Sequence, residues 1–307
     1  MSHWSRLHER GSPLGIRIVA ACYRLIGERA ARLLLYPVVG YFLITGRGAR
    51  RASREYFARL QRFAGENAGT PPPGWATSFR HMMAFAESAL HKLAAWTGRG
   101  KALNVAFPDR PRFDALIASG KGALLVGAHL GNLEMARAIA AEWRLATVNA
   151  IVYTEHAPAF RHALEASGAE FAANLIHVTQ IGPDTILLLK DKIDRGELLV
   201  LVGDRTPPAD SARVCSVDFL GAPAAFAQGP YVLASLLECP VYLLFCLKEG
   251  DGYRIYLEPF AERIVLPRQE REAALRGYAQ RYARRLEELC LRSPYQWFNF
   301  YNYWQQP

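Results

Sequence analysis

From about residue 100 onward, the sequence alternates short, almost purely apolar runs with longer amphipathic segments. A strand buried on both faces reads as a continuous apolar run, and helices between such strands are typical of parallel sheets. The pattern therefore predicts an α/β fold with a mixed, largely parallel sheet flanked by helices. The expected strands are 122–128, 146–153, 174–178, 198–203, 214–219, 240–247 and 253–258, and the expected helices are 110–119, 132–143, 157–167, 184–195, 226–238 and 269–292.

The N-terminal part differs from the rest because it carries the whole excess of positive charge. The chain has a formal net charge of +9, and residues 1–62 contain twelve arginines and three glutamates. Such a segment favours an anionic surface. Its arginines alternate with large aliphatic residues, which favours an anionic membrane surface, contacted through residues 13–62, over a nucleic acid.

Within this part, residues 17–32 place arginines on one helical stripe and apolar residues roughly opposite, as in a helix that lies in a membrane interface. The next run, 33–46, is uncharged but shorter than the roughly 17–25 residues of a spanning helix. Pro37 and Gly40 are expected to interrupt it. A segment that dips into the bilayer, a tilted span and two ordinary helices packed on the core all stay open, whereas the scattered arginines argue against a signal peptide.

The proline-rich stretch 68–74 is the clearest linker. Residues 49–65 before it read as a basic helix and residues 75–96 after it as an amphipathic one. We therefore divide the chain into amphipathic, membrane-associating helices at 1–70 and an α/β domain at 71–307. Aromatic residues dominate 294–304, as in a segment packed on the core, an interfacial aromatic belt or the wall of a lipid-binding groove.

Several common catalytic patterns are absent from the sequence. There is no GxSxG, Walker A loop, GxGxxG after a strand or HExxH, so a serine hydrolase, a P-loop enzyme and a dinucleotide enzyme lose support. The five cysteines lie far apart without a CxxC pair, which predicts reduced core residues and neither a disulfide frame nor a metal site. No cofactor is expected.

One constellation remains, the H-x4-E pattern of His129 and Glu134. His129 follows an apolar strand, where α/β sheets present their functional side chains. Gly131 and Asn132 are typical of a helix start, so Glu134 is expected in the first turn, from which its carboxylate can fold back to the imidazole. Such a carboxylate fixes the tautomer of a histidine base. The alternative is a loop histidine hydrogen-bonded near a capping glutamate.

The residues "HLGNLE" resemble the H-x4-D/E block of the lysophospholipid acyltransferase superfamily, and closely the H-x-G-N-x-E version of the late lipid A (lauroyl/myristoyl) acyltransferases. The stretches 197–208 and 217–245 are similar to the family's Asp-bearing loop and to its glycine-containing block, and the tail resembles its terminal P-x-x-W-x-W. The resemblance runs from about residue 15 to the end. It implies a glycerol-phosphate-acyltransferase-like fold and transfer of an acyl chain from a thioester, usually on acyl carrier protein, to a hydroxyl of a membrane-bound lipid.

Carried onto this chain, the resemblance implies that His129 is the general base and Glu134 its orienting carboxylate, with direct attack on the thioester and no acyl-enzyme. It implies a place beside the site for Asp204 and Arg205. For these two, a local ion pair is the alternative, and for Gly221 the alternative is a purely structural turn. The substrate-binding residues expected on this basis are Gly131, Asn132, Tyr153, Asp204, Arg205, Thr206 and Gly221, with no metal ligand.

Two departures from the family bear on the acceptor. Thr154 stands where the lipid A enzymes usually place an arginine, and residues 299–302 replace their His-Arg-Arg run. Those arginines suit a phosphorylated acceptor. We therefore expect a less anionic acceptor, such as another glycolipid, an amino-acid lipid or a polyene pigment acid (aryl polyene), at the cytoplasmic face of a bacterial inner membrane. A lipid A acyltransferase and a non-catalytic lipid-binding protein of the same fold are the alternatives.

Overall fold

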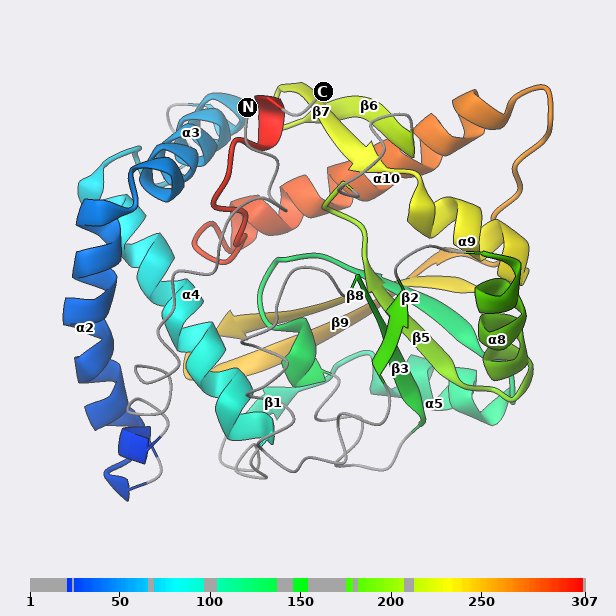
Figure 1. Cartoon of the computed structure of the whole chain (residues 1–307), viewed down its shortest axis with the longest axis horizontal. Coiled ribbons are helices and arrows are strands. Elements are labelled where there is room, and N and C mark those ends of the chain that lie inside the picture. The colour runs from blue at the N-terminus through cyan, green and yellow to red at the C-terminus, as the bar shows by residue number, and fades with distance from the viewer. Residues whose placement is uncertain are drawn as a thin grey trace.

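The structure is a computed structural model of the chain, and it describes residues 21–23, 25–65, 69–96, 104–136, 146–153, 175–178, 182–206 and 213–305. The predicted helix 157–167, most of 132–143 and the first twenty residues lie outside the described residues. In the described part, helices surround one central sheet (Figure 1). The helices are α2 (Glu28–Thr45), α3 (Arg47–Ala64), α4 (Trp75–Trp96), α5 (Arg110–Ala118), α8 (Pro183–Asp194), α9 (Gly229–Leu237), α10 (Arg271–Arg292) and the short 3-10 helix η6 (Tyr303–Gln305).

Among the described residues, the main sheet has seven strands in the order β1-β9-β8-β2-β5-β3-β4. Neighbouring strands run parallel except β8 and β9, which form an antiparallel pair. The prediction of a mixed, largely parallel sheet is confirmed. The strands are β1 (Val105–Ala106), β2 (Ala123–Gly127), β3 (Val148–Tyr153), β4 (Leu175–Val178), β5 (Leu198–Val202), β8 (Val241–Glu249) and β9 (Gly252–Ala261).

Both faces of the sheet are covered. Alternate residues of a strand point to opposite sides, and each side packs against its own apolar cluster. In β2, Leu124 packs in the core cluster that includes Leu286 of α10, whereas Leu125 packs in the cluster that includes Phe113 of α5. All five residues of β2 are buried. Burial of each large aliphatic side chain contributes about 1.5–3 kcal/mol, so β2 is a rigid element on which to place a site.

A separate antiparallel hairpin of β6 (Val214–Phe219) and β7 (Ala222–Ala227) lies over α10. The helix predicted at 226–238 begins only at Gly229, because the preceding residues form β7. The run "APAAFA" has little intrinsic strand preference, and its pairing with β6 determines its conformation. A turn in which Leu220 and Gly221 both have positive φ closes the hairpin.

The N-terminal region differs from the expectation in one respect, the position of the helix breaks. Pro37 and Gly40 lie inside the continuous helix α2, and the chain instead breaks at Gly27, with φ of 103°, and at Gly46. A proline removes one helical hydrogen bond, that of the carbonyl four residues earlier. Leu33, which carries that carbonyl, is exposed, so water can take the place of the missing donor. No helix in the described part of the chain has the length and apolar character needed to cross a membrane.

The N-terminal helices pack closely on the rest of the protein. Leu35 and Leu43 of α2 share a cluster with Met82 of α4. Tyr56 of α3 is fully buried, and its ring lies 5.1 Å from that of Trp297 near the C-terminus. These contacts hold α3 against the segment that follows α10. The division of the chain at residue 70 stays a prediction.

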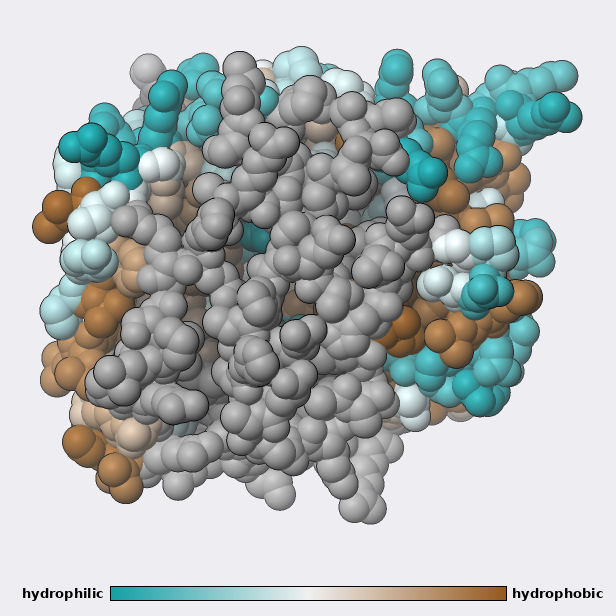
Figure 2. Space-filling view, in the orientation of Figure 1, coloured by the Kyte–Doolittle hydropathy of each residue, from teal (hydrophilic) through white to brown (hydrophobic). Residues whose placement is uncertain are grey.

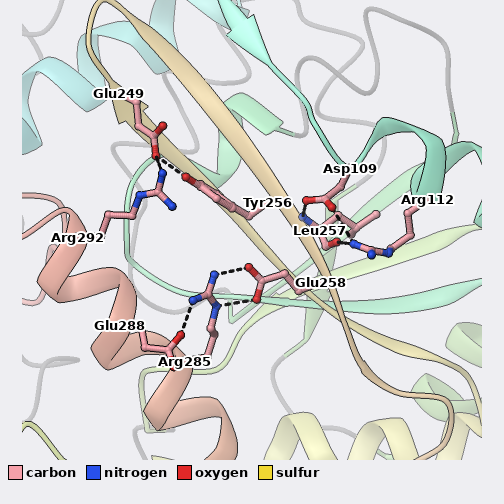
Figure 3. Close-up of polar contacts among 9 residues, drawn as sticks. All are labelled: Asp109, Arg112, Glu249, Tyr256, Leu257, Glu258, Arg285, Glu288 and Arg292. Atoms are coloured by element: carbon pink, nitrogen blue, oxygen red, sulfur yellow. Dashed lines mark hydrogen bonds and ion pairs between the residues drawn. The ribbon is translucent and has the colours of Figure 1, made fainter.

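Polar contacts hold α10 against the antiparallel pair of strands β8 and β9 (Figure 3). Arg285 of α10 makes two hydrogen bonds to the carboxylate of Glu258 in β9, at 2.7 and 2.5 Å. Arg292, the last residue of α10, pairs with Glu249 at 3.2 Å. A bidentate arginine–carboxylate pair fixes direction as well as distance. The end of α10, and the segment 293–305 after it, are thereby directed back toward the centre of the sheet.

Candidate active site

The two central parallel strands β2 and β5 bring His129 and Asp204 together. Gly127, the last residue of β2, is in register with Val202, the last residue of β5, and the amide of Gly203 donates to the carbonyl of Gly127 at 2.9 Å. His129 and Asp204 each lie two residues beyond their strand. Their side chains therefore emerge at the same carboxyl edge of the sheet, where α/β proteins place their functional groups.

The carboxylate of Asp204 is fully buried and makes three hydrogen-bond contacts with His129. Its Oδ1 lies 2.8 Å from Nδ1 of the ring. Both carboxylate oxygens lie 3.0 Å from the backbone nitrogen of His129, which donates to them. Two further donors reach Oδ2, the indole Nε1 of Trp297 at 3.2 Å and the amide Nδ2 of Asn299 at 2.8 Å. A buried carboxylate with this many donors is an ion in a preformed cage.

The same contacts set the protonation of the pair. Burial alone would raise the pKa of Asp204, but the neighbouring His129 and Arg205 and the bond from Asn299 outweigh it and lower that pKa to about 2. Burial and the charge of Arg205 lower the pKa of His129 below its usual 6.5, against the opposing attraction of Asp204. At neutral pH the carboxylate is therefore ionised and the imidazole neutral. Nδ1 must carry its proton to donate to Asp204, which leaves the lone pair on Nε2.

Because Asp204 covers Nδ1, we infer that the exposed part of the His129 ring includes Nε2. The His129 side chain is 28% exposed, whereas the carboxylate against Nδ1 has no exposure at all. Of the described histidine side chains, two others are buried and engaged: His81 bonds to Ser53 and to the carbonyl of Trp297, and His91 bonds to Tyr253 and Glu28. His129 is thus the accessible imidazole within the described part of the chain.

Glu134, the carboxylate of the H-x4-E pattern, lies in the first turn of the helix that begins at Leu133. It is half-buried. The carboxylate on Nδ1 of His129 is that of Asp204. The orienting role of Glu134 stays a prediction.

The helix start expected at Gly131 and Asn132 is confirmed. The side-chain oxygen of Asn132 accepts a hydrogen bond from the backbone nitrogen of Met135 at 3.2 Å, the bond that an N-cap residue makes. Asn132 is fully buried, and its amide donates to the carbonyl of Ser88 in α4. Gly131 has φ of 71°, and a Cβ there would lie 2.1 Å from the carbonyl oxygen of Cys246. Both residues shape the loop that holds His129.

The C-terminal segment 295–304 forms one side of this site. Leu130 and Trp297 form an antiparallel bridge, and the backbone nitrogen of Phe298 donates to the carbonyl of His129 at 2.7 Å. Trp297 is fully buried and Asn299 is 2% exposed. The segment is therefore packed on the core, and the interpretation as an interfacial aromatic belt is wrong.

Trp297 and Asn299 were not among the expected site residues. The sequence signal for Asn299 is its place between two phenylalanines, because an amide within a buried aromatic run needs polar partners. The partners themselves come from other strands and cannot be read from the local sequence.

Arg205 and Thr206 follow Asp204 at the same edge of the sheet. The guanidinium of Arg205 donates from Nε to the side-chain oxygen of Asn299 at 2.9 Å and from Nη2 to the carbonyl of Phe298 at 3.3 Å. Its carbon Cζ lies 5.7 Å from the ring centre of Tyr301. Thr206 is buried.

The remaining expected residues lie elsewhere or beyond the description. Tyr153 ends β3, and its side chain is outside the described residues. Gly221 lies in the β6–β7 turn, beside a hollow of about 690 Å³ that Phe63, Gln280 and Glu288 help to line. Among the described residues, no group of His, Cys, Asp and Glu is arranged to hold a metal ion.

Fold and site together place an imidazole backed by a buried carboxylate at the end of a central parallel strand, an arrangement that suits a general base. Comparison with protein families adds the chemistry. The family model described as bacterial lipid A biosynthesis acyltransferase matches residues 76–306, so the chain belongs to that family and is an acyltransferase. The family acts by acyl transfer to a lipid acceptor. A comparison with curated proteins gave no match.

Proposed function

We propose that the protein moves a fatty acyl chain from an acyl thioester, carried by acyl carrier protein, to a hydroxyl of a membrane-bound acceptor, with Nε2 of His129 as the general base. The observation that supports this most is the 2.8 Å contact between Nδ1 of His129 and the ionised Asp204. It leaves a neutral, accessible Nε2 whose basicity a fixed negative charge supports.

The reaction proceeds by direct attack. Nε2 takes the proton of the acceptor hydroxyl as its oxygen attacks the thioester carbonyl. The new C–O bond forms, the C–S bond breaks, and the leaving thiolate takes the proton back from the imidazolium of His129. Asp204 stabilises that imidazolium through Nδ1. No enzyme nucleophile is needed, in line with the absence of a GxSxG elbow.

Two other side chains have proposed parts in this step. The guanidinium of Arg205 is held beside the site by Asn299 and Phe298, which suits a charge that develops on the thioester oxygen or a phosphate of the carrier's prosthetic group. Glu134 is our proposed second carboxylate. Because Asp204 occupies Nδ1, Glu134 would constrain the ring or the acceptor from the first turn of the following helix.

The acceptor that we propose is less anionic than lipid A precursors, such as another glycolipid, an amino-acid lipid or a polyene pigment acid. The place of the His-Arg-Arg run of the lipid A enzymes is taken here by Asn299 and the residues up to Asn302. The side-chain amide of Asn299 is hydrogen-bonded to Asp204 and Arg205, so it is not placed to bind an incoming phosphate. A lipid A acceptor is the alternative, and a direct assay separates the two.

The experiment compares wild type with His129→Gln in vesicles that hold either a lipid A precursor or a neutral glycolipid. Acyl carrier thioester is the donor, and both the freed carrier thiol and the acylated lipid are quantified. We expect wild type to acylate the neutral lipid faster, and His129→Gln to lose at least about 100-fold of that rate, the usual worth of a general base. Equal rates in the two proteins would show that His129 is not the general base.

We also propose that α2 and α3 bind the cytoplasmic face of the inner membrane. The side of α2 that faces away from α4 exposes large apolar residues, among them Leu33, Tyr41 and Ile44, each at least 60% exposed. Figure 2 shows hydrophobic residues along the edge where α2 lies and hydrophilic ones over α3. The exposed residues of α3 include the arginines Arg47, Arg51, Arg54 and Arg62. An apolar face next to a basic one suits insertion among anionic headgroups.

Vesicle binding tests this surface. Replacing both Leu33 and Ile44 by glutamate leaves the buried face of α2 intact, and we expect binding to vesicles with phosphatidylglycerol to fall at least tenfold. Leu187 and Leu188 of α8, which are 68% and 48% exposed on another helix, offer the matched control, since replacing both by glutamate adds the same charge away from α2. A loss of binding that is equal for both proteins would contradict the assignment of the surface.

A further inference from the structure

The uncharged side chain of Asn299 touches both charged groups beside His129. It is 2% exposed, and it lies on the C-terminal segment. Its Nδ2 donates to Oδ2 of Asp204 at 2.8 Å, and its Oδ1 accepts from Nε of Arg205 at 2.9 Å. An amide turned the other way would set donor against donor and acceptor against acceptor, so the two charges fix its orientation.

Asp204 and Arg205 are neighbours in sequence, and the amide of Asn299 bonds to both of them. A direct ion pair between these neighbours would draw the carboxylate toward the guanidinium and away from the ring of His129. The inserted amide satisfies each charge with a hydrogen bond and keeps the two apart. Oδ1 of Asp204 then stays on Nδ1 of His129, while Oδ2 is held by Asn299 and Trp297.

The backbone around Asn299 is anchored without its side chain. The nitrogen of Phe298 donates to the carbonyl of His129, and the carbonyl of Trp297 accepts from Nε2 of the buried His81 at 2.8 Å. Replacing the amide therefore changes the polar contacts of Asp204 and Arg205 more than it changes the path of the segment.

We propose that Asn299 is a positioning residue for acyl transfer: its side-chain amide separates Asp204 from Arg205 and so keeps Asp204 on the ring of His129. This inference rests on the proposed role of His129 as the base.

The test uses two substitutions that keep the branching and the number of heavy atoms of the asparagine side chain but have opposite electrostatic effects. Asn299→Leu removes both hydrogen bonds and frees Arg205 to pair with Asp204, which weakens the support for the imidazolium. Asn299→Asp keeps the bond to Arg205 but adds a negative charge close to His129. We expect both variants to lower kcat by about 10- to 100-fold, since each disturbs a charge-assisted hydrogen bond of the base.

The pH dependence of kcat/KM separates positioning from a general structural effect. The acid limb should move to lower pH in Asn299→Leu and to higher pH in Asn299→Asp, each by about half a unit or more, because the pKa of His129 follows its neighbouring charge. Asn149→Leu, the same change at a buried side chain that donates to Glu197 at the opposite end of the sheet, is the matched control and should keep the wild-type limb. Thermal melts identify a variant that fails to fold, and Asn299→Asp then carries the test alone through its limb.

The proposal is overturned if both Asn299 variants keep the wild-type acid limb, or if Asn149→Leu changes kcat and the limb as they do. Failure of the proposed function looks different. In that case His129→Gln retains its rate, whatever the Asn299 variants do.

Discussion

Replacing Asp204 by asparagine should disable the base while changing its volume very little. An asparagine at this position has one acceptor and one donor where the carboxylate has two acceptors. If its oxygen faces His129, its NH₂ meets the donors of Trp297 and Asn299. If it is flipped, the NH₂ meets the backbone N–H of His129 and forces Nδ1 to become an acceptor, which moves the ring proton to Nε2.

The structure gives the magnitude of both consequences. Loss of the correct tautomer and of the negative charge predicts a fall in kcat of about 10²- to 10⁴-fold, as in other histidine bases that lose their carboxylate. The pKa of Asp204, about 2 against an ordinary 3.8, means that the ionised side chain adds about 2 kcal/mol to the free energy of unfolding above pH 4. That contribution is lost in wild type as the pH falls from about 4 to 2, and it is absent from Asp204→Asn throughout.

Steady-state acyl transfer measured against pH, together with urea unfolding at pH 7, checks these values. Asp194 of α8, exposed and paired with Lys190, provides the matched control, because Asp194→Asn makes the same chemical change outside the site. The reasoning is refuted if folded Asp204→Asn keeps kcat within threefold of wild type. It is also refuted if Asp194→Asn lowers kcat to the same degree.

Two further predictions concern the framework of the site. Burial lowers the pKa of His81 to about 4, so the unfolded chain binds a proton at this side chain below pH 6.5 and the folded chain only below about pH 4. The free energy of unfolding should therefore fall by about 3 kcal/mol as the pH falls from 6.5 to 4. The difference in unfolding free energy between wild type and His81→Gln, measured by urea titration against pH, should show this fall. Gly131→Ala should cost at least about 3 kcal/mol, because a Cβ there meets a backbone carbonyl at 2.1 Å as well as an unfavourable φ. Gly250→Ala, with φ of 58° and open space around the Cβ, should lose only about 1 kcal/mol in the same denaturation experiment, and similar losses for both would show that the loop relaxes.

Much of the fold could be predicted because burial leaves a direct trace in the sequence. The strands on both sides of His129 read as apolar runs, and all of β2 is buried as such a run requires. The start of the following helix was predictable from Asn132, whose capping bond is local. The strand β7 was not, because its alanines gain strand geometry only from pairing with β6.

The site was predicted in part, for the same physical reason. His129 could be found from its place after a strand, and Glu134 drew attention because it is near in sequence. The partner on Nδ1 depends instead on the register between β2 and β5, which brings Asp204 to the ring. Side-chain bonds from Trp297 and Asn299 depend on where the chain returns after α10, and no local pattern encodes that path.

The bridge between Leu130 and Trp297 has a consequence for the order in which activity arises during synthesis. Translation delivers every strand of the main sheet before Trp297 and Asn299 leave the ribosome. Until then Asp204 lacks two of its donors, and the imidazole has no fixed proton acceptor behind it. A nascent polypeptide should therefore be unable to consume acyl thioesters until residues 295–304 have packed beside His129.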